Sequence, residues 1–300
     1  MICRSEAGQA PVPRVVALTM ARDEADLLPH WVDYYGHQVG VENLIVLDDN
    51  SVDGSTDDLP CMRLRLPPGP WKPSWAQARL DLVNGLSRGL LACYEVVVFA
   101  DIDEFLVPDP AHYDGLADYL GKNHHLDVIA PLAVNVLHKP SLEPTLNPTQ
   151  PLLAQRHFVK FAPGMCKPLV KRKPADWLAS FHGIAAPFEI DPRLWMMHLK
   201  YCDVSLLMKV SAGRHARHRE GRGHPRSAWA LGSNELASQL SSWVQTPDEQ
   251  RVQEFDPSEL DLSTVVRRKG GRRFRSHGPQ LSAMERNPLR RLPERFRTAF

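Results

Sequence analysis

The chain has 300 residues, which is enough for one large α/β domain, or for a domain of about 200–230 residues with an appended segment. The hydrophobic fraction of 43% and the charged fraction of 24% are typical of a folded globular protein and exclude disorder over most of the length. The net charge of +1 excludes a global electrostatic attraction to nucleic acid, and the 26 prolines argue against an all-helical bundle.

The apolar runs of the sequence are too short to cross a membrane. LIVL at 44–47 and VVVFA at 96–100 are a fraction of the ~20 residues that span a bilayer. The stretch MICRSEAGQAPVPR carries charges and lacks the apolar segment of a signal peptide. The five cysteines form no CxxC pair, which favours reduced thiols. We therefore expect a cytoplasmic protein.

Strand and helix patterns alternate over the first 110 residues. PRVVALTM at 13–20 predicts a buried strand, and apolar residues at helical spacing follow over 27–39, with Pro29 in the first turn. ENLIVLDDNS predicts a second strand, residues 74–94 a second helix, and EVVVFADIDEFLV a third strand. Such a pattern predicts a parallel sheet covered on both faces, with ligands bound at the carboxyl ends of its strands.

Clustered carboxylates end two of these strands. Asp48 and Asp49 follow one of them, and Asp101 and Asp103 lie in FADIDEFLV on the other. On an extended segment, residues i and i+2 point to the same side, so Asp101 and Asp103 would share a hard divalent cation. The alternative is a solvated acidic strand end with no ligand.

The second half of the chain is less regular. Nine prolines between 140 and 192 predict a loop-rich region with antiparallel edge strands, and the pattern turns helical from about 203. Between 264 and 300, eleven Lys or Arg stand against two acidic residues. We expect a main domain over 1–225, with a nucleotide-binding half at 13–110 and an acceptor-side half at 111–225, and a helical and basic C-terminal extension over 226–300.

Three motifs support a more specific interpretation. An acidic pair, a Trp-containing helix and a DDxSxDG loop occur over 19–54, followed by ADIDEFLV and, at 196–203, by MMHLKYCD. In this order they resemble the glycosyltransferase family 2-like proteins over about residues 1–210. The resemblance implies the GT-A fold, a mostly parallel Rossmann-like sheet with helices on both faces. It also implies a nucleotide-sugar donor, with UDP expected as the nucleotide, and Mn²⁺ or Mg²⁺ as the cofactor.

The resemblance also implies roles for individual residues. His198 joins the two DxD aspartates on the metal, with His182 as the alternative ligand, and Lys200 stabilises the departing diphosphate. Arg79 faces the donor phosphates or lies on a solvated helix face. The residues expected on the nucleoside side, of which Ser51 and Asp53 fit a plain turn equally well, are Arg22, Asp23, Glu24, Asp48, Asp49, Ser51, Asp53 and Asp101.

Transfer with inversion needs a base that deprotonates the acceptor hydroxyl. Glu189 and Asp191 are the candidates, because FEID lies a few residues before His198. The Glu-Asp acceptor motif that is common in the family has no clear counterpart here, which leaves the base and the stereochemistry open.

We therefore expect a metal-dependent hexosyltransferase that acts on a hydroxyl of a glycan or glycolipid. A nucleotidyltransferase is an alternative, although TMARDEAD lacks the Gly-rich phosphate loop usual for that class. A non-catalytic glycan- or nucleotide-binding module on the same fold is another. The basic segment 264–300 fits peripheral contact with an anionic membrane, or a solvated tail folded back onto acidic surface; nucleic acid is not expected as a partner.

Overall fold

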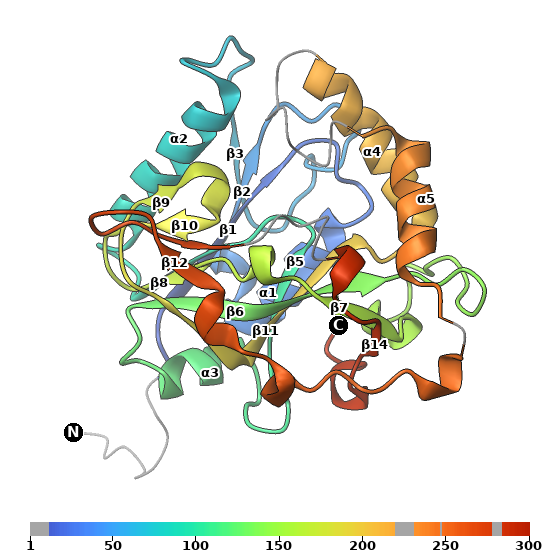
Figure 1. The fold of residues 1–300 in the computed structure, drawn as a ribbon. Helices are drawn as coiled ribbons and strands as arrows, with labels where there is room; N and C mark the ends of the chain where they lie inside the picture. The colour runs from blue at the N-terminus through green and yellow to red at the C-terminus, as the bar shows by residue number, and fades with distance from the viewer. Residues whose placement is uncertain (1–11, 220–230, 247, 278–283) are drawn as a thin grey trace, which may run out of the picture.

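The computed structural model describes residues 12–219, 231–246, 248–277 and 284–300, which fold around a mixed sheet of ten strands and a second sheet of four (Figure 1). The strands are β1 Val15–Ala21, β2 Leu44–Asp48, β3 Met62–Arg65, β4 Val96–Phe99, β5 Glu104–Pro108, β6 Val128–Leu137, β7 Phe158–Phe161, β8 Val170–Lys171, β9 Trp177–Leu178, β10 Gly183–Ile184, β11 Glu189–Tyr201, β12 Val266–Arg268, β13 Phe274–Ser276 and β14 Arg290–Arg291. The α-helices are α1 Leu28–Val39, α2 Trp75–Leu90, α3 Leu116–Lys122, α4 Val204–Arg219 and α5 Ser233–Trp243.

The amino-terminal half of the large sheet is parallel, in the order β4-β1-β2-β3. Alternate residues of β1 pack on opposite faces, as the strand period of two requires. Val15 and Ala17 share a core with α1, whereas Val16 and Leu18 share one with α2. The predicted α/β fold with helices on both faces of a central sheet is therefore confirmed.

The other half of the large sheet contains antiparallel strands. β8 pairs antiparallel with β4 and β6, and β7 pairs antiparallel with β6 and β14. The long strand β11 lies parallel to β6 and antiparallel to β5. Because β6 and β11 run in the same direction, the carboxyl end of β11 lies beside the carboxyl end of β6.

The prediction of one continuous strand through FADIDEFLV was wrong. The chain leaves β4 after Phe99, turns through residues 101–103 and enters β5 at Glu104. A hydrogen bond of 3.0 Å from the Glu104 amide to the Asp101 carbonyl closes this turn. The two DxD carboxylates are therefore positioned by a turn and not by the alternation of a strand.

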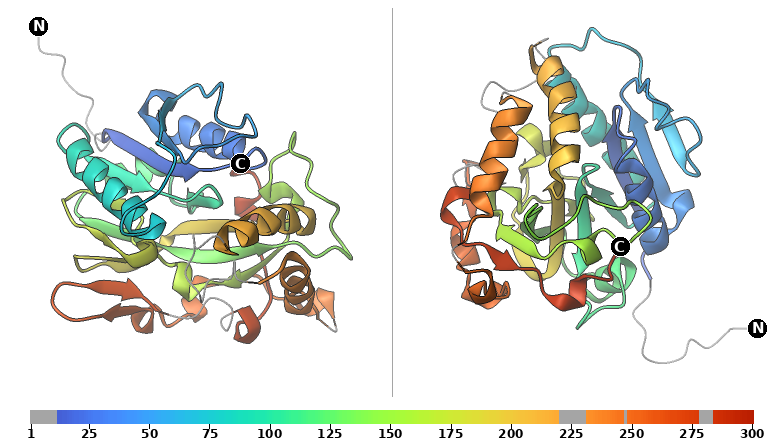
Figure 2. Two further views of the ribbon diagram at one scale, coloured as in Figure 1. Left: turned by 90° about the horizontal axis from the view of Figure 1, so that it is seen from above. Right: turned by 90° about the vertical axis from the view of Figure 1, so that its right-hand side faces the viewer.

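Among its described residues, the segment after residue 225 contains the helix α5, helical residues at 284–286, and otherwise short strands and single 3-10 turns. α4 and α5 lie side by side over the carboxyl ends of β6 and β11 (Figures 1 and 2). β14 joins the large sheet, and the β12–β13 hairpin joins β10 in the small one. The domain boundary at 225 stays a prediction. Across the described ranges, no helix is long and apolar enough to span a bilayer.

Candidate active site

The loops after β1 and β2 meet at one edge of the sheet, because the two strands are parallel. The Asp49 amide donates to the Ala21 carbonyl at 2.9 Å, and the Val52 amide donates to the Asp23 carboxylate at 2.8 Å. The Asp23 amide donates to the Ser51 hydroxyl at 3.2 Å. The structure thus brings together the loops that the sequence predicted to contact a nucleoside.

The hydrogen-bonding capacity of Asp48 is used by other residues of the protein. Its carboxylate is fully buried and accepts hydrogen bonds from the Ser51 amide at 2.7 Å and from the Arg63 guanidinium at 2.8 Å. Burial would raise the pKa of Asp48, but the hydrogen bonds from Ser51 and Arg63 outweigh it and lower the pKa below its usual value. Both carboxylate oxygens are therefore used to hold the loop, so we do not retain Asp48 as a nucleoside contact.

Asp49 differs from its neighbour because one of its oxygens accepts nothing. Oδ2 accepts a hydrogen bond of 2.9 Å from the Trp75 indole and lies 3.7 Å from the Arg22 guanidinium. Oδ1 is buried and has no hydrogen-bond partner among the described residues. A buried acceptor without a donor costs about 1–3 kcal/mol. The hydrogen-bonding capacity of this oxygen is therefore unused in the structure.

Asp53 belongs to a turn. Its side chain is exposed and accepts hydrogen bonds from the amide and the hydroxyl of Ser55, at 3.0 and 2.6 Å. The next residue, Gly54, has a φ of 80°, which glycine adopts without strain. The turn interpretation accounts for Asp53, and we do not retain it as a nucleotide contact.

Asp101 is held by two cations. One oxygen pairs with Arg79, and the other lies 3.4 Å from the Lys167 ammonium. Burial alone would raise the pKa of Asp101, but Arg79 and Lys167 hold it at about 2. Arg79 also packs over the Phe181 ring, at 4.8 Å from its centroid. Arg79 therefore positions Asp101 in this structure and does not present a free cation to a phosphate.

Lys167 is a site residue that the sequence did not reveal. It is 2% exposed and lies 2.5 Å from Glu104 as well as close to Asp101. Burial would lower the pKa of this ammonium, but Glu104 and Asp101 raise it above its usual value. Burial conversely raises the pKa of Glu104, against the effect of Lys167. One buried cation therefore balances two carboxylates beneath the turn.

Asp103, Glu104 and His198 form the group that fits a metal ion. Each offers one ligand atom, and these atoms lie within 4.8 Å of one another. His198 Nε2 lies 3.5 Å from the Asp103 carboxylate. Burial would raise the pKa of Asp103, but His198 and the more distant Arg214 hold it well below its usual value. Carboxylates together with one imidazole suit Mn²⁺, which accepts both oxygen and nitrogen ligands.

Asn135 on β6 fixes the orientation of His198. Its side-chain oxygen accepts a hydrogen bond of 2.5 Å from His198 Nδ1, and its amide nitrogen donates to the Met284 sulfur at 2.8 Å. Because an amide oxygen only accepts, Nδ1 carries a proton. Nε2 is then the ring nitrogen on the side of Asp103, where it would bind a metal ion through its lone pair once it carries no proton.

His182, the alternative ligand, is not part of this group. Its Nδ1 lies 2.6 Å from the Gly164 carbonyl. Burial and the nearby Lys167 lower its pKa to about 3, so the imidazole is neutral. Of the two predicted histidines, His198 is the one that the fold brings to the carboxylates.

α4 closes the site on the side of β11. A cavity of about 20 Å³ beside Asp103 is lined by Lys200, Glu24 and Arg214, among others. Arg214 pairs with Glu24 at 2.7 Å, which links α4 to the loop after β1. Burial and the neighbouring Arg214 lower the pKa of Lys200 to about 7. Arg214, and Lys200 in its protonated form, thus lie next to the candidate metal position.

The expectation that Glu189 or Asp191 is the base is not retained. Both lie at the start of β11, whereas His198 lies near its end, so seven or more residues of extended chain separate them, about 20 Å. Asp191 is engaged by the Tyr119 hydroxyl at 2.7 Å and the Arg193 amide at 2.8 Å. Proximity in sequence was misleading because the intervening segment is a single strand.

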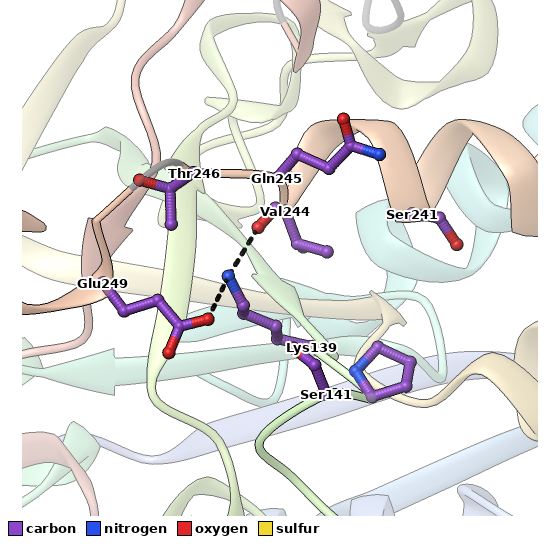
Figure 3. Close-up of a pocket in the computed structure, with 8 residues that line it drawn as sticks. Lys139, Ser141, Ser241, Val244, Gln245, Thr246 and Glu249 are labelled. Atoms are coloured by element: carbon purple, nitrogen blue, oxygen red, sulfur yellow. Dashed lines mark hydrogen bonds and ion pairs between the residues drawn. The ribbon is translucent and has the colours of Figure 1, made fainter.

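A second, wider cavity of about 680 Å³ lies beyond the carboxyl end of β6, next to the end of α5 (Figure 3). Lys139 donates to the Val244 carbonyl at 3.0 Å and pairs with Glu249 at 2.8 Å, so its charge is neutralised. The remaining polar lining consists of hydroxyl and amide groups, including Ser241 and Gln245. This lining suits a neutral polar ligand better than an anion.

Comparison with known proteins adds the following findings. No family model matches the sequence, and no curated protein sequence matches it significantly. Among solved structures, a mycobacterial protein is similar with a TM-score of 0.29 and 22% identity over 41% of this chain and 42% of that one. Glucosyl-3-phosphoglycerate synthase from Mycobacterium tuberculosis, solved with Mn²⁺ and UDP-glucose, is similar with a TM-score of 0.29 and 21% identity over 40% of this chain and 44% of that one.

The matched part is thus less than half of each solved chain. Similarity at this level does not transfer an activity or a ligand to this chain. Membership of the glycosyltransferase family 2-like proteins, for which the motifs were the only basis, stays a prediction.

Proposed function

We propose that the chain is a metal-dependent glycosyltransferase that moves a sugar from a nucleoside diphosphate donor, UDP-sugar, to a hydroxyl of a glycan or glycolipid. This proposal rests on two features that lie at one edge of the sheet. Asp103, Glu104 and His198 offer a set of metal ligands, and the loops after β1 and β2 present the unpartnered oxygen of Asp49. A nucleoside diphosphate needs both kinds of contact, one for the phosphates and one for the base.

In this proposal Asp49 Oδ1 accepts the ring N–H of uracil. Trp75 and Arg22 lie on the other oxygen of the same carboxylate and hold it in place. Cytosine lacks this ring N–H in its neutral form and adenine presents a ring nitrogen acceptor instead, whereas guanine carries a ring N–H of its own. A buried acceptor discriminates strongly between a ligand that supplies a donor and one that does not.

Asp103 and His198 would hold the metal ion, with Glu104 fixed behind them by Lys167. When bound, a divalent cation neutralises charge on the diphosphate leaving group. Asp101 is kept ionised by Arg79 and Lys167, and it is expected to orient the donor next to the ribose. Arg214, together with Lys200 when it is protonated, would add positive charge beside Asp103.

The wider cavity beside Lys139 is the proposed position of the distal part of the acceptor. Its hydroxyl and amide groups suit sugar hydroxyls, and its single cation is already paired. It lies past the end of β6, the strand that also carries Asn135 against His198. A glycan bound there would extend toward the metal side of the sheet.

A ligand screen tests the proposal. We expect UDP to raise the melting temperature of the protein in the presence of Mn²⁺ and to do so more than ADP or CDP, which lack the ring N–H, because a ligand that binds only the folded state stabilises it by mass action. Labelled UDP-sugars should then release UDP, at least by slow hydrolysis. Release of pyrophosphate from UTP and a sugar phosphate would instead identify a nucleotidyltransferase, and no shift with any nucleotide would contradict the proposal.

A further inference from the structure

The basic C-terminal segment divides into two sets of residues. Arginines near the end of the chain turn back onto the body of the protein. Arg295 forms a bidentate pair with Asp109 at 2.8 and 2.9 Å, and Arg290 pairs with Glu259 at 3.1 Å. Arg291 and Arg297 donate to backbone carbonyls. These cations stabilise the fold and are not available to a partner.

The β12–β13 hairpin carries the other set. The segment 267–275 holds six exposed cations and no acidic residue, namely Arg267, Arg268, Lys269, Arg272, Arg273 and Arg275. None of them forms an ion pair with another residue in the described part of the chain. The hairpin extends from the edge of the molecule, on the side of α2 and away from α4 and α5 (Figures 1 and 2).

The register of the hairpin gathers four of these cations on one face. Arg267 lies directly opposite Arg275, and the Lys269 amide donates to the Arg273 carbonyl at 2.7 Å, which continues the pairing toward the turn. Residues two apart on a strand share a face, so these four residues point the same way. Like charges placed directly opposite each other destabilise a strand pair, and an anionic partner would remove that cost.

The opposite face holds the hairpin to the protein. Val266 and Phe274 pack against the core cluster beneath α2, and the Ser276 hydroxyl donates to the Gly164 carbonyl at 3.2 Å. A Cβ at Gly183 on β10 would come within 2.6 Å of the Phe274 carbonyl, so the two strands approach closely. The cationic face is therefore fixed outward and cannot turn toward the core.

The positive charge of this face affects the pKa of the neighbouring residue His277. His277 is exposed, and its pKa is lowered by its slight burial and by Arg267, Lys269 and Arg275. Arg267, Lys269 and Arg275 all shift the pKa of His277 in the same direction. The face thus retains a net positive potential at its base as well as at its tip.

We propose that the β12–β13 hairpin is a docking surface for an anionic bilayer, with Arg267, Lys269, Arg273 and Arg275 facing the lipid phosphates. The four cations lie on the outward face of a hairpin that extends from the edge of the molecule, where a planar charged surface can reach them. It carries no aromatic side chain, because Phe274 points inward, whereas proteins that bind single-stranded nucleic acid combine cations with exposed stacking rings. The proposal does not depend on the transferase activity.

Vesicle sedimentation with the full chain tests the proposal. The test variant combines Arg267→Gln, Lys269→Gln and Arg275→Gln. The control combines Arg14→Gln, Lys72→Gln and Arg193→Gln, which removes the same charge from exposed side chains that form no ion pair with a described residue. Circular dichroism checks that both variants fold.

We expect the parent and the control to bind vesicles of phosphatidylserine and phosphatidylcholine, and not vesicles of phosphatidylcholine alone. Each cation strengthens such binding about fivefold, so the hairpin variant should bind about a hundredfold more weakly. Raising the salt from about 0.1 M to 1 M should release the parent, because the screening length falls from about 10 to 3 Å.

Three results would overturn the proposal. One is equal binding by the hairpin and control variants, and another is no binding of the parent to anionic vesicles. The third is tighter binding to a DNA duplex than to vesicles at the same salt, which would identify nucleic acid as the partner.

Discussion

Replacing Lys167 by Met tests the charge balance beneath the DxD turn. Met keeps the length and the apolar stem of the side chain, so the change removes mainly the ammonium group that lies 2.5 Å from Glu104 and 3.4 Å from Asp101. Removing one partner of a buried ion pair costs about 3–5 kcal/mol, because the other charge stays buried without compensation. Glu104 limits this cost by taking up a proton, since burial already raises its pKa. We therefore expect a loss near the lower limit, about 3 kcal/mol.

Urea unfolding near neutral pH measures this loss. Lys173→Met is the matched control, because Lys173 pairs with Asp127 at 2.7 Å but both side chains are exposed, and such pairs contribute about 0.2–1 kcal/mol. The deficit of Lys167→Met should shrink as the pH falls toward about 4.5, where Glu104 is protonated in the unfolded chain as well. A second variant, Lys167→Met with Glu104→Gln, should recover most of the stability.

The reasoning about Lys167 would be refuted if Lys167→Met cost no more than Lys173→Met. It would also be refuted if the double variant were less stable than the single one, since that would mean that the two groups do not compensate each other.

Three further predictions concern single residues. Asp49→Asn should weaken UDP binding at least tenfold in calorimetry, because the amide NH2 that replaces Oδ1 cannot accept the uracil N–H; an unchanged affinity would contradict its role. Asn135→Leu should weaken Mn²⁺ binding roughly tenfold or more, and Asn135→Asp should recover part of the affinity. Equal Mn²⁺ affinity in the parent and both variants would exclude a positioning role for Asn135. Lys171→Met should be more stable than the parent, by the largest amount below about pH 7 and the smallest near pH 10.5. Because the pKa of Lys171 is about 7 in the folded protein, the free energy of unfolding of the parent rises by at most about 5 kcal/mol between these pH values. A difference that does not change with pH would contradict this.

The parts of the fold that depend on local pattern were predictable from the sequence. β1, β2 and β4 are short apolar runs, and α1 and α2 follow the helical spacing, with Pro29 in the first turn of α1 and Ser74 capping α2. Because parallel strands end at a common edge, the acidic residues after β1, β2 and β4 could be expected to meet. The contact of Asp23, after β1, with Ser51, after β2, agrees with that expectation.

The residues that form ion pairs with the site carboxylates come from distant segments of the chain. No local sequence pattern identifies them. Arg63 on β3 neutralises Asp48, and Lys167 reaches Asp101 from a Pro-rich loop. Neither position has a pattern that distinguishes it from an ordinary surface cation. The availability of Asp49, in contrast to Asp48, therefore follows only from the three-dimensional arrangement.

In the C-terminal segment, the number of basic residues did not predict which of them are free of ion pairs. A count of eleven cations treats them alike, whereas the fold pairs Arg290 and Arg295 with acids and leaves the hairpin cations unpaired. The difference is set by β14 joining the large sheet, which carries its neighbours onto acidic side chains. A short strand of two residues has too little pattern to predict such pairing.

Titration calorimetry of UDP into the Asp103→Asn protein, with and without Mn²⁺, tests the central claim most directly. Asparagine keeps the volume of the side chain but is a much poorer ligand for a hard cation. The control is Asp53→Asn, an exposed acid in the turn after β2 that we do not assign to the site. We expect the parent and the control to bind UDP much more tightly with Mn²⁺ than without it, and Asp103→Asn to lose this difference while unfolding at a similar temperature. Binding of UDP and Mn²⁺ by Asp103→Asn as tightly as by the parent would contradict the assignment of the metal site and, with it, the proposed mechanism.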